Sequence, residues 1–221
     1  MITLALDAST YTGDVAVIVD GRVAAECTTA MRGQQEERLM PAVARALADA
    51  HVVAPAIDRI VCGSGPGSFT SLRIAGAIAK GLATGLGRPL FGVPSPALVV
   101  GGTKLAPGRY LVAIDALRGE LYAALYEVEQ NGEVEELDPA RLLRAEDVHR
   151  VATELGASVV GPAAIEGGIV ATPRARAVVR LERMIARAGA VDVGGWEPAY
   201  GRLAEAQVRW ESTHGRPLPT A

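Results

Sequence analysis

The sequence predicts a duplicated α/β fold of two lobes, and three observations support this prediction. The chain opens with three consecutive strands, whereas a doubly wound dinucleotide-binding fold begins strand, helix, strand. The next segments alternate between helix and strand, which gives the order βββαβαβα for the first half. Residues 110–128 then repeat the opening pattern, in which an apolar strand ends in an aspartate and a turn leads into a second strand.

The opening strands are predicted from apolar runs and one turn. Residues 2–9 (ITLALDAS) form the first run, and residues 14–28 contain two more around Asp20 and Gly21. An Asp-Gly pair between apolar runs is a strong hairpin signal, because glycine accepts the positive φ that such turns require. We therefore expect the first three strands to be antiparallel.

An amphipathic helix is predicted over residues 34–50. Its apolar positions recur at helical spacing on one side, namely Leu39, Val43, Ala46, Leu47 and Ala50. Pro41 should either kink this helix or lie in a first turn that begins near Met40, since proline has no N–H to donate.

The later elements follow the same alternation. Residues 59–63 and 88–93 are predicted strands, and residues 71–86 and 95–101 are predicted helices. The turn-rich stretch 104–109 is a candidate boundary, so we expect an N-terminal lobe of residues 1–103 and a smaller C-terminal lobe of residues 104–221. Beyond the hairpin at 110–128, helices are predicted over 147–155 and 172–188, with a strand at 158–161 between them.

Two halves that each contain strand, aspartate, turn and strand are the construction of actin-like and sugar-kinase-like ATPases. In those proteins the hairpins cradle the phosphates of a nucleotide. The pattern thus predicts an actin-like, two-lobed α/β fold with mixed sheets flanked by helices.

Composition excludes several classes of protein. The 221 residues carry a formal net charge of −3, so no overall field attracts the chain to nucleic acid or to an anionic membrane. Cys27 and Cys62 lie in strand-like apolar runs and are expected to be small buried side chains, without a disulfide framework. The N-terminus has no basic signal region and no stretch resembles a membrane span, so a cytoplasmic protein is expected.

The glycine-rich stretch GSGPGSFT, residues 63–70, follows a predicted strand and precedes a predicted helix. Phosphate-binding sites often occur at such a position. The stretch lacks the lysine of a P-loop, the last glycine and the acid of a dinucleotide fingerprint, and the G-x-S-x-G of a hydrolase elbow. We expect a tight structural turn in which Ser68 or Thr70 caps the following helix, with anion binding or a partner contact as alternatives. The residues assigned to this turn are Gly63, Gly65, Pro66, Gly67, Ser68 and Thr70.

The helix predicted over residues 71–86 is apolar around about half of its circumference, counting about 100° per residue. An ordinary surface helix buries a stripe about 100° wide. The helix should therefore be either buried inside the domain or packed on two sides, one against the core and the other against another protein.

Two aspartates are the most site-like carboxylates of the chain. Asp7 and Asp115 each end a predicted strand, and with Ser9 and Thr10 they are candidates for a nucleotide pocket; the alternative is that both aspartates cap turns. No catalytic residue and no metal site are predicted, because the three histidines are scattered along the chain and no carboxylate near them completes a zinc set.

Several strings of residues resemble the TsaB (YeaZ) family. They are LALDAST at the start, GSGPGSFTSLRIAGAIAKGLA in the middle, DALRGELYAALY later and EPAYGR near the end. The resemblance implies an actin-like fold and a non-catalytic subunit of the tRNA threonylcarbamoyladenosine modification complex. In that family the partner TsaD carries the metal and nucleotide site, and an ATPase, TsaE, joins the complex. The complex transfers a threonylcarbamoyl group to the adenosine beside the tRNA anticodon.

The sequence departs from the family pattern at a few positions. Relatives often read H-S-E-x-L-x-P where this chain has Gln35, Glu36, Glu37, Arg38, Leu39, Met40 and Pro41, so the histidine is absent. Ser71 stands where relatives usually have glycine, and Leu117 where they usually have arginine. The missing histidine removes any role that this side chain has in relatives, but it leaves the family resemblance intact. Neither of the other two changes touches a proposed chemical group.

The resemblance also implies that a pair of helices forms the partner interface. The residues assigned to it are Glu36, Leu39, Met40, Val43, Leu72, Arg73, Ala75, Gly76, Ala79, Lys80 and Ala83. TsaD is the expected partner, tRNA is reached through the complex, and a homodimer can use the same helices.

No intrinsic cofactor is expected, since ATP and metal belong to the partner subunits. The alternatives are an actin-like ATPase or small-molecule kinase acting alone, and a peptidase.

Overall fold

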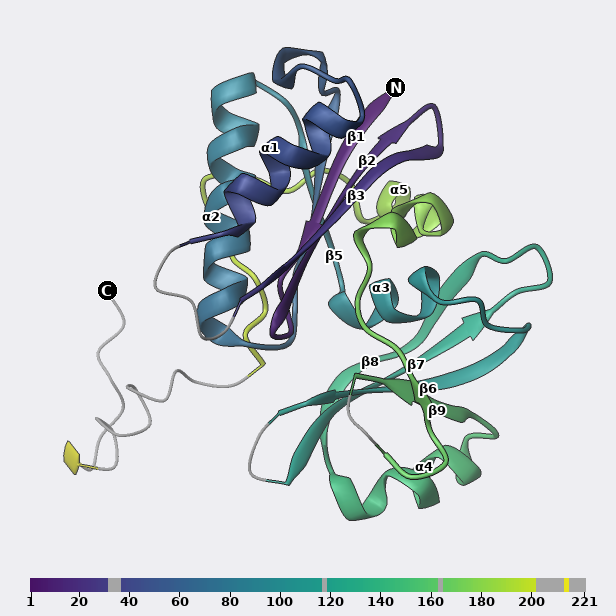
Figure 1. The fold of residues 1–221 in the computed structure, drawn as a ribbon. Helices are drawn as coiled ribbons and strands as arrows, with labels where there is room; N and C mark the ends of the chain where they lie inside the picture. The colour runs from purple at the N-terminus through teal and green to yellow at the C-terminus, as the bar shows by residue number, and fades with distance from the viewer. Residues whose placement is uncertain (32–36, 117–118, 163–164, 202–212, 215–221) are drawn as a thin grey trace.

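The computed structural model describes residues 1–31, 37–116, 119–162, 165–201 and 213–214 (Figure 1). The first sheet has the order β3-β2-β1-β4-β5, with β1–β2 and β2–β3 antiparallel and β1–β4 and β4–β5 parallel. Its strands are β1 (Ile2–Asp7), β2 (Thr12–Val19), β3 (Arg22–Ala30), β4 (Arg59–Gly63) and β5 (Leu90–Val93).

The second sheet repeats this topology strand for strand. Its order is β8-β7-β6-β9-β10, again with two antiparallel pairs followed by two parallel pairs. Its strands are β6 (Gly108–Asp115), β7 (Glu120–Val128), β8 (Val134–Arg144), β9 (Ser158–Gly161) and β10 (Ile169–Val170). The predicted duplication is confirmed, and the fold is the two-lobed actin-like one.

The helices separate into an outer and an inner group. In Figure 1, α1 (Leu39–Asp49) and α2 (Phe69–Leu86) lie side by side on the outer face of the first sheet, and α4 (Val148–Glu154) lies on the outer face of the second. Between the sheets lies α3 (Ser95–Gly102), whose eight residues are all buried. A helix covered on every side needs no polar face, which explains the apolar sequence SPALVVGG. One hydrophobic core joins α3 to both sheets.

The first hairpin forms as the sequence predicts. Asp20 and Gly21 connect β2 to β3 with φ angles of 49° and 75°. Two positive φ angles in succession fit the right-handed twist of the flanking strands, and Asp-Gly is a preferred pair for such a turn.

Two predicted helices differ in their bounds. The helix expected over 34–50 begins at Leu39, so Pro41 lies in the first turn, where N–H groups have no helical acceptor and proline causes no kink. The helix expected over 172–188 is divided into a 3₁₀ segment, η3 (Ala175–Arg180), and a short helix, α5 (Glu182–Ala188). Two further 3₁₀ turns, η1 (Ala54–Ala56) and η2 (Ala145–Asp147), precede β4 and α4.

The expected lobe boundary at residues 103/104 falls between the two sheets, but the chain later returns to the first lobe. Helix α5 packs beside β5, and the Val191 N–H donates to the Leu90 carbonyl at 2.8 Å. Residues 182–201 therefore pack on the first lobe, although they follow the second in sequence.

The segment that returns fastens the lobes together through arginines. Arg174 pairs with Asp14 (3.0 Å) and Glu26 (2.9 Å) on the first sheet, and Arg176 Nη1 lies 3.4 Å from Glu26. Arg180 donates to backbone carbonyls at the end of α3 and in the β7–β8 hairpin. Because the segment 174–180 contacts both lobes, these interactions oppose rotation of one lobe against the other.

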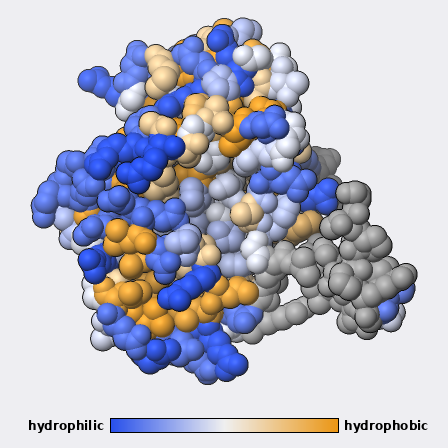
Figure 2. Space-filling view, turned by 180° about the vertical axis from the view of Figure 1, so that it is seen from behind, coloured by the Kyte–Doolittle hydropathy of each residue, from blue (hydrophilic) through white to orange (hydrophobic). Residues whose placement is uncertain are grey.

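Figure 2 shows one face of the molecule, on which hydrophilic residues predominate and hydrophobic residues gather on the lower, second lobe. Exposed apolar side chains in this lobe include Leu137, Leu142, Ile169 and Val170. Within the described part of the chain, no helix has the length and apolar character needed to cross a membrane.

Candidate functional site

The glycine-rich loop after β4 is filled by the chain itself. A Cβ atom at Gly63 would lie 1.9 Å from Oδ2 of Asp7, and one at Gly67 would lie 2.1 Å from the Ser9 carbonyl oxygen. Such distances are far below van der Waals contact, so only glycine allows β1 and the loop to approach this closely. The glycines are therefore required for packing against Asp7 and Ser9.

Three backbone N–H groups of the loop already have acceptors. The Ser64 N–H donates to the Val93 carbonyl (2.7 Å), the Gly65 N–H to Ser95 Oγ (3.0 Å) and the Ser68 N–H to the Ser9 carbonyl (2.7 Å). Pro66 has no N–H to offer. A phosphate cradle requires several free N–H groups that converge on one point, so this geometry supports the structural interpretation of the loop.

Helix α2 starts at this loop, with Ser68 in the N-cap position as predicted. Its hydroxyl lies 3.0 Å from Ser71 Oγ, however, and makes no capping hydrogen bond to the backbone. Thr70 is exposed within the first turn. The turn is therefore held by the loop's packing and by backbone hydrogen bonds, and not by a hydroxyl cap.

Asp7 and Ser9, two of the predicted nucleotide-pocket residues, form a buried polar cluster with Ser95. Asp7 Oδ1 accepts from the Ser9 N–H (2.9 Å) and from Ser9 Oγ (2.8 Å), and Oδ2 accepts from Ser95 Oγ (2.6 Å). Burial raises the pKa of Asp7, although the hydrogen bonds from Ser95 and Ser9 act in the opposite direction. With both oxygens occupied, this carboxyl group joins β1 to α3.

The other two pocket candidates are less buried than this cluster. Thr10 Oγ1 interacts with the backbone of Thr12 within its own turn, and Asp115 is exposed at the end of β6 in the second lobe. Across the described residues, no group of three or more His, Cys, Asp and Glu side chains is arranged to hold a metal ion. A nucleotide pocket formed by Asp7, Ser9, Thr10 and Asp115 stays a prediction, and the geometry does not favour it.

Helix α2 is covered on two of its sides. One side packs on the first sheet through Ala75, Ala79 and Ala83, and Leu72 on the same helix is also fully buried. A neighbouring side is covered by residues 191–201, which we call the strap; Figure 1 shows this yellow-green segment running along the helix. In the strap, Pro198 packs on Gly76, and Lys80 Nζ donates to the carbonyls of Trp196 (2.9 Å) and Gly194 (3.3 Å).

The third side of α2 is open to solvent. Ala77 and Gly81 are exposed one turn apart, and a Cβ atom at Gly81 would meet nothing within 4 Å. Helix α1 lies beside α2 (Figure 1). We call six of the exposed residues of this helix pair the docking face; they are Met40, Pro41 and Ala44 of α1 and Arg73, Ala77 and Gly81 of α2.

Most of the residues that the sequence assigns to a partner interface are buried within the chain itself. Seven of the predicted residues are buried within the chain, namely Leu39, Val43, Leu72, Ala75, Gly76, Ala79 and Ala83. Of the others, Met40 and Arg73 are exposed, Lys80 is half-buried and bonded to the strap, and Glu36 lies outside the described residues. The apolar arc of α2 was correctly recognised, but the core and the strap cover most of it.

The i, i+4 spacing of Ala77 and Gly81 was the available signal for the open side, because small residues one turn apart allow another helix to approach closely. The strap had no signal of this kind. It contacts α2 from more than 110 positions later in the chain.

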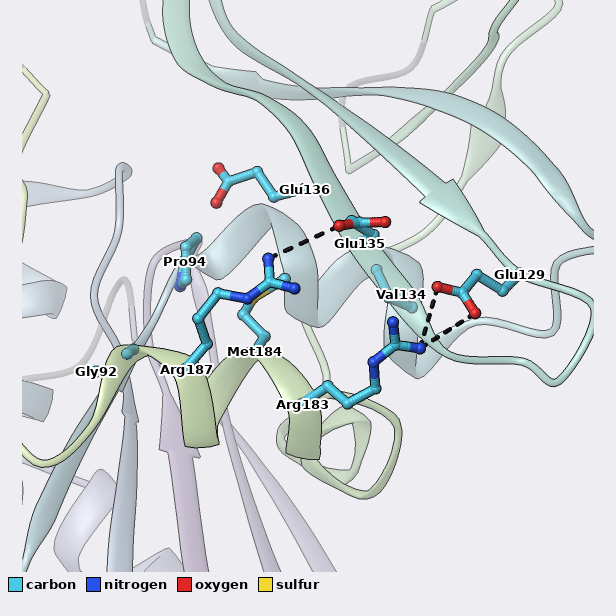
Figure 3. A pocket seen from close by; sticks show the side chains of 10 residues that line it. Gly92, Pro94, Glu129, Val134, Glu135, Glu136, Arg183, Met184 and Arg187 are labelled. Atoms are coloured by element: carbon cyan, nitrogen blue, oxygen red, sulfur yellow. Dashed lines mark hydrogen bonds and ion pairs between the residues drawn. The ribbon is translucent and has the colours of Figure 1, made fainter.

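A pocket of about 290 Å³ lies between α5 and the β7–β8 hairpin (Figure 3). Its two cations already have carboxylate partners: Arg183 Nη1 lies 3.2 Å from both oxygens of Glu129, and Arg187 Nη1 lies 3.7 Å from Glu135. The pocket therefore forms part of the arginine contacts between the lobes, and its side chains favour a structural role.

Comparison with known proteins identifies the family to which the chain is similar. A family model described as "TsaD: tRNA N6-adenosine threonylcarbamoyltransferase" matches residues 29–179. The tRNA threonylcarbamoyladenosine biosynthesis protein TsaB of Bacillus subtilis is 30% identical, over 95% of this chain and 98% of the relative. The TsaB protein of Escherichia coli is 36% identical, over 67% of this chain and 65% of the relative.

A solved structure shows the same fold. YeaZ from Pseudomonas aeruginosa superposes with a TM-score of 0.76 at 30% sequence identity, covering 90% of this chain and 99% of that one. Sequence and structure agree over nearly the full length, and the chain therefore belongs to the TsaB (YeaZ) family, within the wider family that the TsaD model describes.

Proposed function

We propose that this chain is a binding subunit of the machinery that makes tRNA threonylcarbamoyladenosine, and that a TsaD-type protein binds its docking face. Relatives across the family are named for this biosynthesis. The observation that carries the proposal is the contrast between two features. The glycine-rich loop is closed by its own chain, whereas the adjacent helix α2 leaves a side of small residues open.

The docking face is suited to a helix of another protein. Packed helices lie 8–10 Å apart, and small residues at the crossing point permit the shorter distances. Ala77 and Gly81 provide such a crossing point, and Met40, which is 40% exposed, supplies a flexible apolar side chain beside it. A second copy of this chain could use the same face, which is the basis of the proposed homodimer.

Several observations support a subunit without catalytic chemistry of its own. Asp7 is fully buried and hydrogen-bonded, so it is poorly placed to reach a nucleotide's metal ion. Burial and the nearby Asp7 raise the pKa of the Cys62 thiol, which disfavours the thiolate that a cysteine peptidase needs. We accordingly propose that ATP and metal bind on partner subunits, including a TsaE-type ATPase.

Contact with tRNA is proposed to pass mainly through the complex, because the net charge of −3 provides little general attraction for a polyanion. A cytoplasmic location follows from the same proposal, since the substrate tRNA is found there.

The proposal predicts that Ala77→Arg abolishes binding to the cognate TsaD-type protein. The substitution should cost little stability, because Ala77 is exposed and arginine is a good helix former. It places a long charged side chain where a partner helix must approach, so Kd measured by calorimetry is expected to rise about 100-fold or more. Unchanged affinity with a folded variant would contradict the assigned face.

His149→Arg is the matched control, because it adds the same charge at an exposed position on α4 of the other lobe. Calorimetry of the isolated chain with ATP and Mg²⁺ provides a separate test. We expect neither micromolar binding of ATP nor its turnover. Detection of binding or of turnover would favour an ATPase or kinase acting alone.

A further inference from the structure

We propose that the strap, residues 191–201, is one wall of the docking face, and that the partner protein contacts it together with α1 and α2. This inference rests on the proposed function, because it describes how the same partner is recognised. It adds a third element to the interface and assigns Lys80 as the residue that positions this element.

The strap is attached to α2 along the row of residues next to the open side. Pro198 Cγ lies 3.1 Å from the Cβ position of Gly76, and Lys80 Nζ donates to the carbonyls of Gly194 and Trp196. On a helix, Lys80 neighbours Ala77 at i−3 and Gly76 at i−4. The strap therefore lies directly beside the surface that Ala77 and Gly81 leave open.

A partner helix seated on this surface has to reach the strap. A helix with its side chains is about 10–12 Å across, so one centred over Ala77 and Gly81 extends about 5 Å to each side. The adjacent row, which begins at Lys80, lies within that reach. Because Lys80 is engaged with two strap carbonyls, the partner meets the strap backbone and its exposed Glu197 at this border.

The strap is anchored well enough to act as a wall. The partly buried Trp196 packs against the hydrophobic core of the first lobe, and its Nε1 lies 3.1 Å from the Cβ position of Gly92. The Ala199 N–H donates to the Ser64 carbonyl at 2.7 Å, which ties the strap to the glycine-rich loop.

The far end of the strap is connected to α2 and to the second lobe. The ring of Tyr200 lies 4.6 Å from that of Phe69 at the start of α2. Tyr122 Oη, on β7 of the second lobe, donates to the Tyr200 carbonyl at 3.3 Å. Part of the partner surface is therefore positioned by contacts with both lobes.

The inference predicts the effect of Lys80→Met, which keeps an apolar stem and removes both hydrogen bonds to the strap. Affinity for the TsaD-type protein is expected to fall about tenfold, because hydrogen bonds from a charged group are lost and the strap is held less firmly beside Ala77. Lys80→Arg, which can still donate to the carbonyls, should recover most of the affinity. Lys104→Met, at an exposed lysine outside the docking face, should leave Kd unchanged.

Hydrogen exchange of the wild-type chain gives a second test that does not depend on any variant folding. Adding the partner should slow exchange in peptides from α1, from α2 and from residues 191–201, and the third region is specific to this inference. If the partner protects both helices but not the strap, or if Lys80→Met binds like wild type, the strap is not part of the interface. If the wild-type chain does not bind the partner at all, the proposed function itself fails.

Discussion

Replacing Gly63 by alanine is expected to destabilise the protein by about 3 kcal/mol, which is the upper range for an added methyl group in a tightly packed core. The new Cβ atom would lie 1.9 Å from Asp7 Oδ2 and 3.0 Å from Ser95 Oγ. Asp7 cannot move aside easily, because three hydrogen bonds from Ser9 and Ser95 hold its carboxyl group in a buried cluster. Denaturant unfolding monitored by circular dichroism would measure the loss.

Gly81→Ala is the matched control for this prediction. Gly81 lies in the interior of α2 with open space around it, so alanine should raise the free energy of unfolding by about 0.5–1 kcal/mol. A double variant, Gly63→Ala with Asp7→Ala, should lose less stability than the two single variants added together, since removing the carboxyl group relieves the clash. Wild-type stability of Gly63→Ala would show that Asp7 does not pack against β4.

Stability is also expected to depend on the ionisation of Asp14. Burial raises the pKa of this carboxyl group from 3.8 to about 6, although the Ala175 N–H and the Arg174 guanidinium oppose the shift. Arg174 is less effective than its 3.0 Å separation from Asp14 suggests, because it also pairs with Glu26 and its Nε is poorly aligned for a hydrogen bond.

The sign follows from linkage. A carboxyl group whose pKa is higher in the folded state binds its proton more tightly there, so its contribution to stability is complete below about pH 4. That contribution is lost as the pH rises through about 6. A shift of about two units corresponds to about 3 kcal/mol, at about 1.4 kcal/mol per unit. Relative to Asp14→Asn, the wild type should therefore lose about 3 kcal/mol between pH 4 and pH 7.

Unfolding curves of both proteins across this range would test the prediction, because the comparison cancels most other titrating groups. Asp49→Asn is the control, since Asp49 makes only an exposed pair with Arg45, and such pairs contribute less than about 1 kcal/mol. If the wild type instead gains stability relative to Asp14→Asn as the pH rises, the ion pair with Arg174 stabilises the charged Asp14 by more than burial destabilises it.

The elements that the sequence predicted well are those with strong local patterns. The Asp20-Gly21 turn and the long apolar helix after residue 68 depend on neighbouring residues, and the structure has both. Strands β8 and β10 were not predicted. The eleven-residue strand β8 has a mixed polar pattern on a sheet edge, and the two-residue strand β10 is too short to show any period.

The residues of the candidate site were predicted only in part. The width of the apolar arc on α2 correctly indicated that more than one surface covers the helix. Periodicity cannot tell a covering segment of the same chain from a separate protein, since both bury the same side chains. For this reason Gly76 and Lys80 were assigned to a partner, whereas they hold the strap.

Patterns in the amino-acid sequence are sufficient to predict the duplicated α/β topology, the family resemblance and the failure of the glycine-rich loop to match any phosphate-binding template. These properties depend on residues close together in the chain. What fills the loop, and which side of α2 remains open, became visible in the folded protein alone. Both depend on contacts between distant segments, Asp7 with Gly63 and the strap with α2, and the contacts form only when burial of apolar surface brings those segments together.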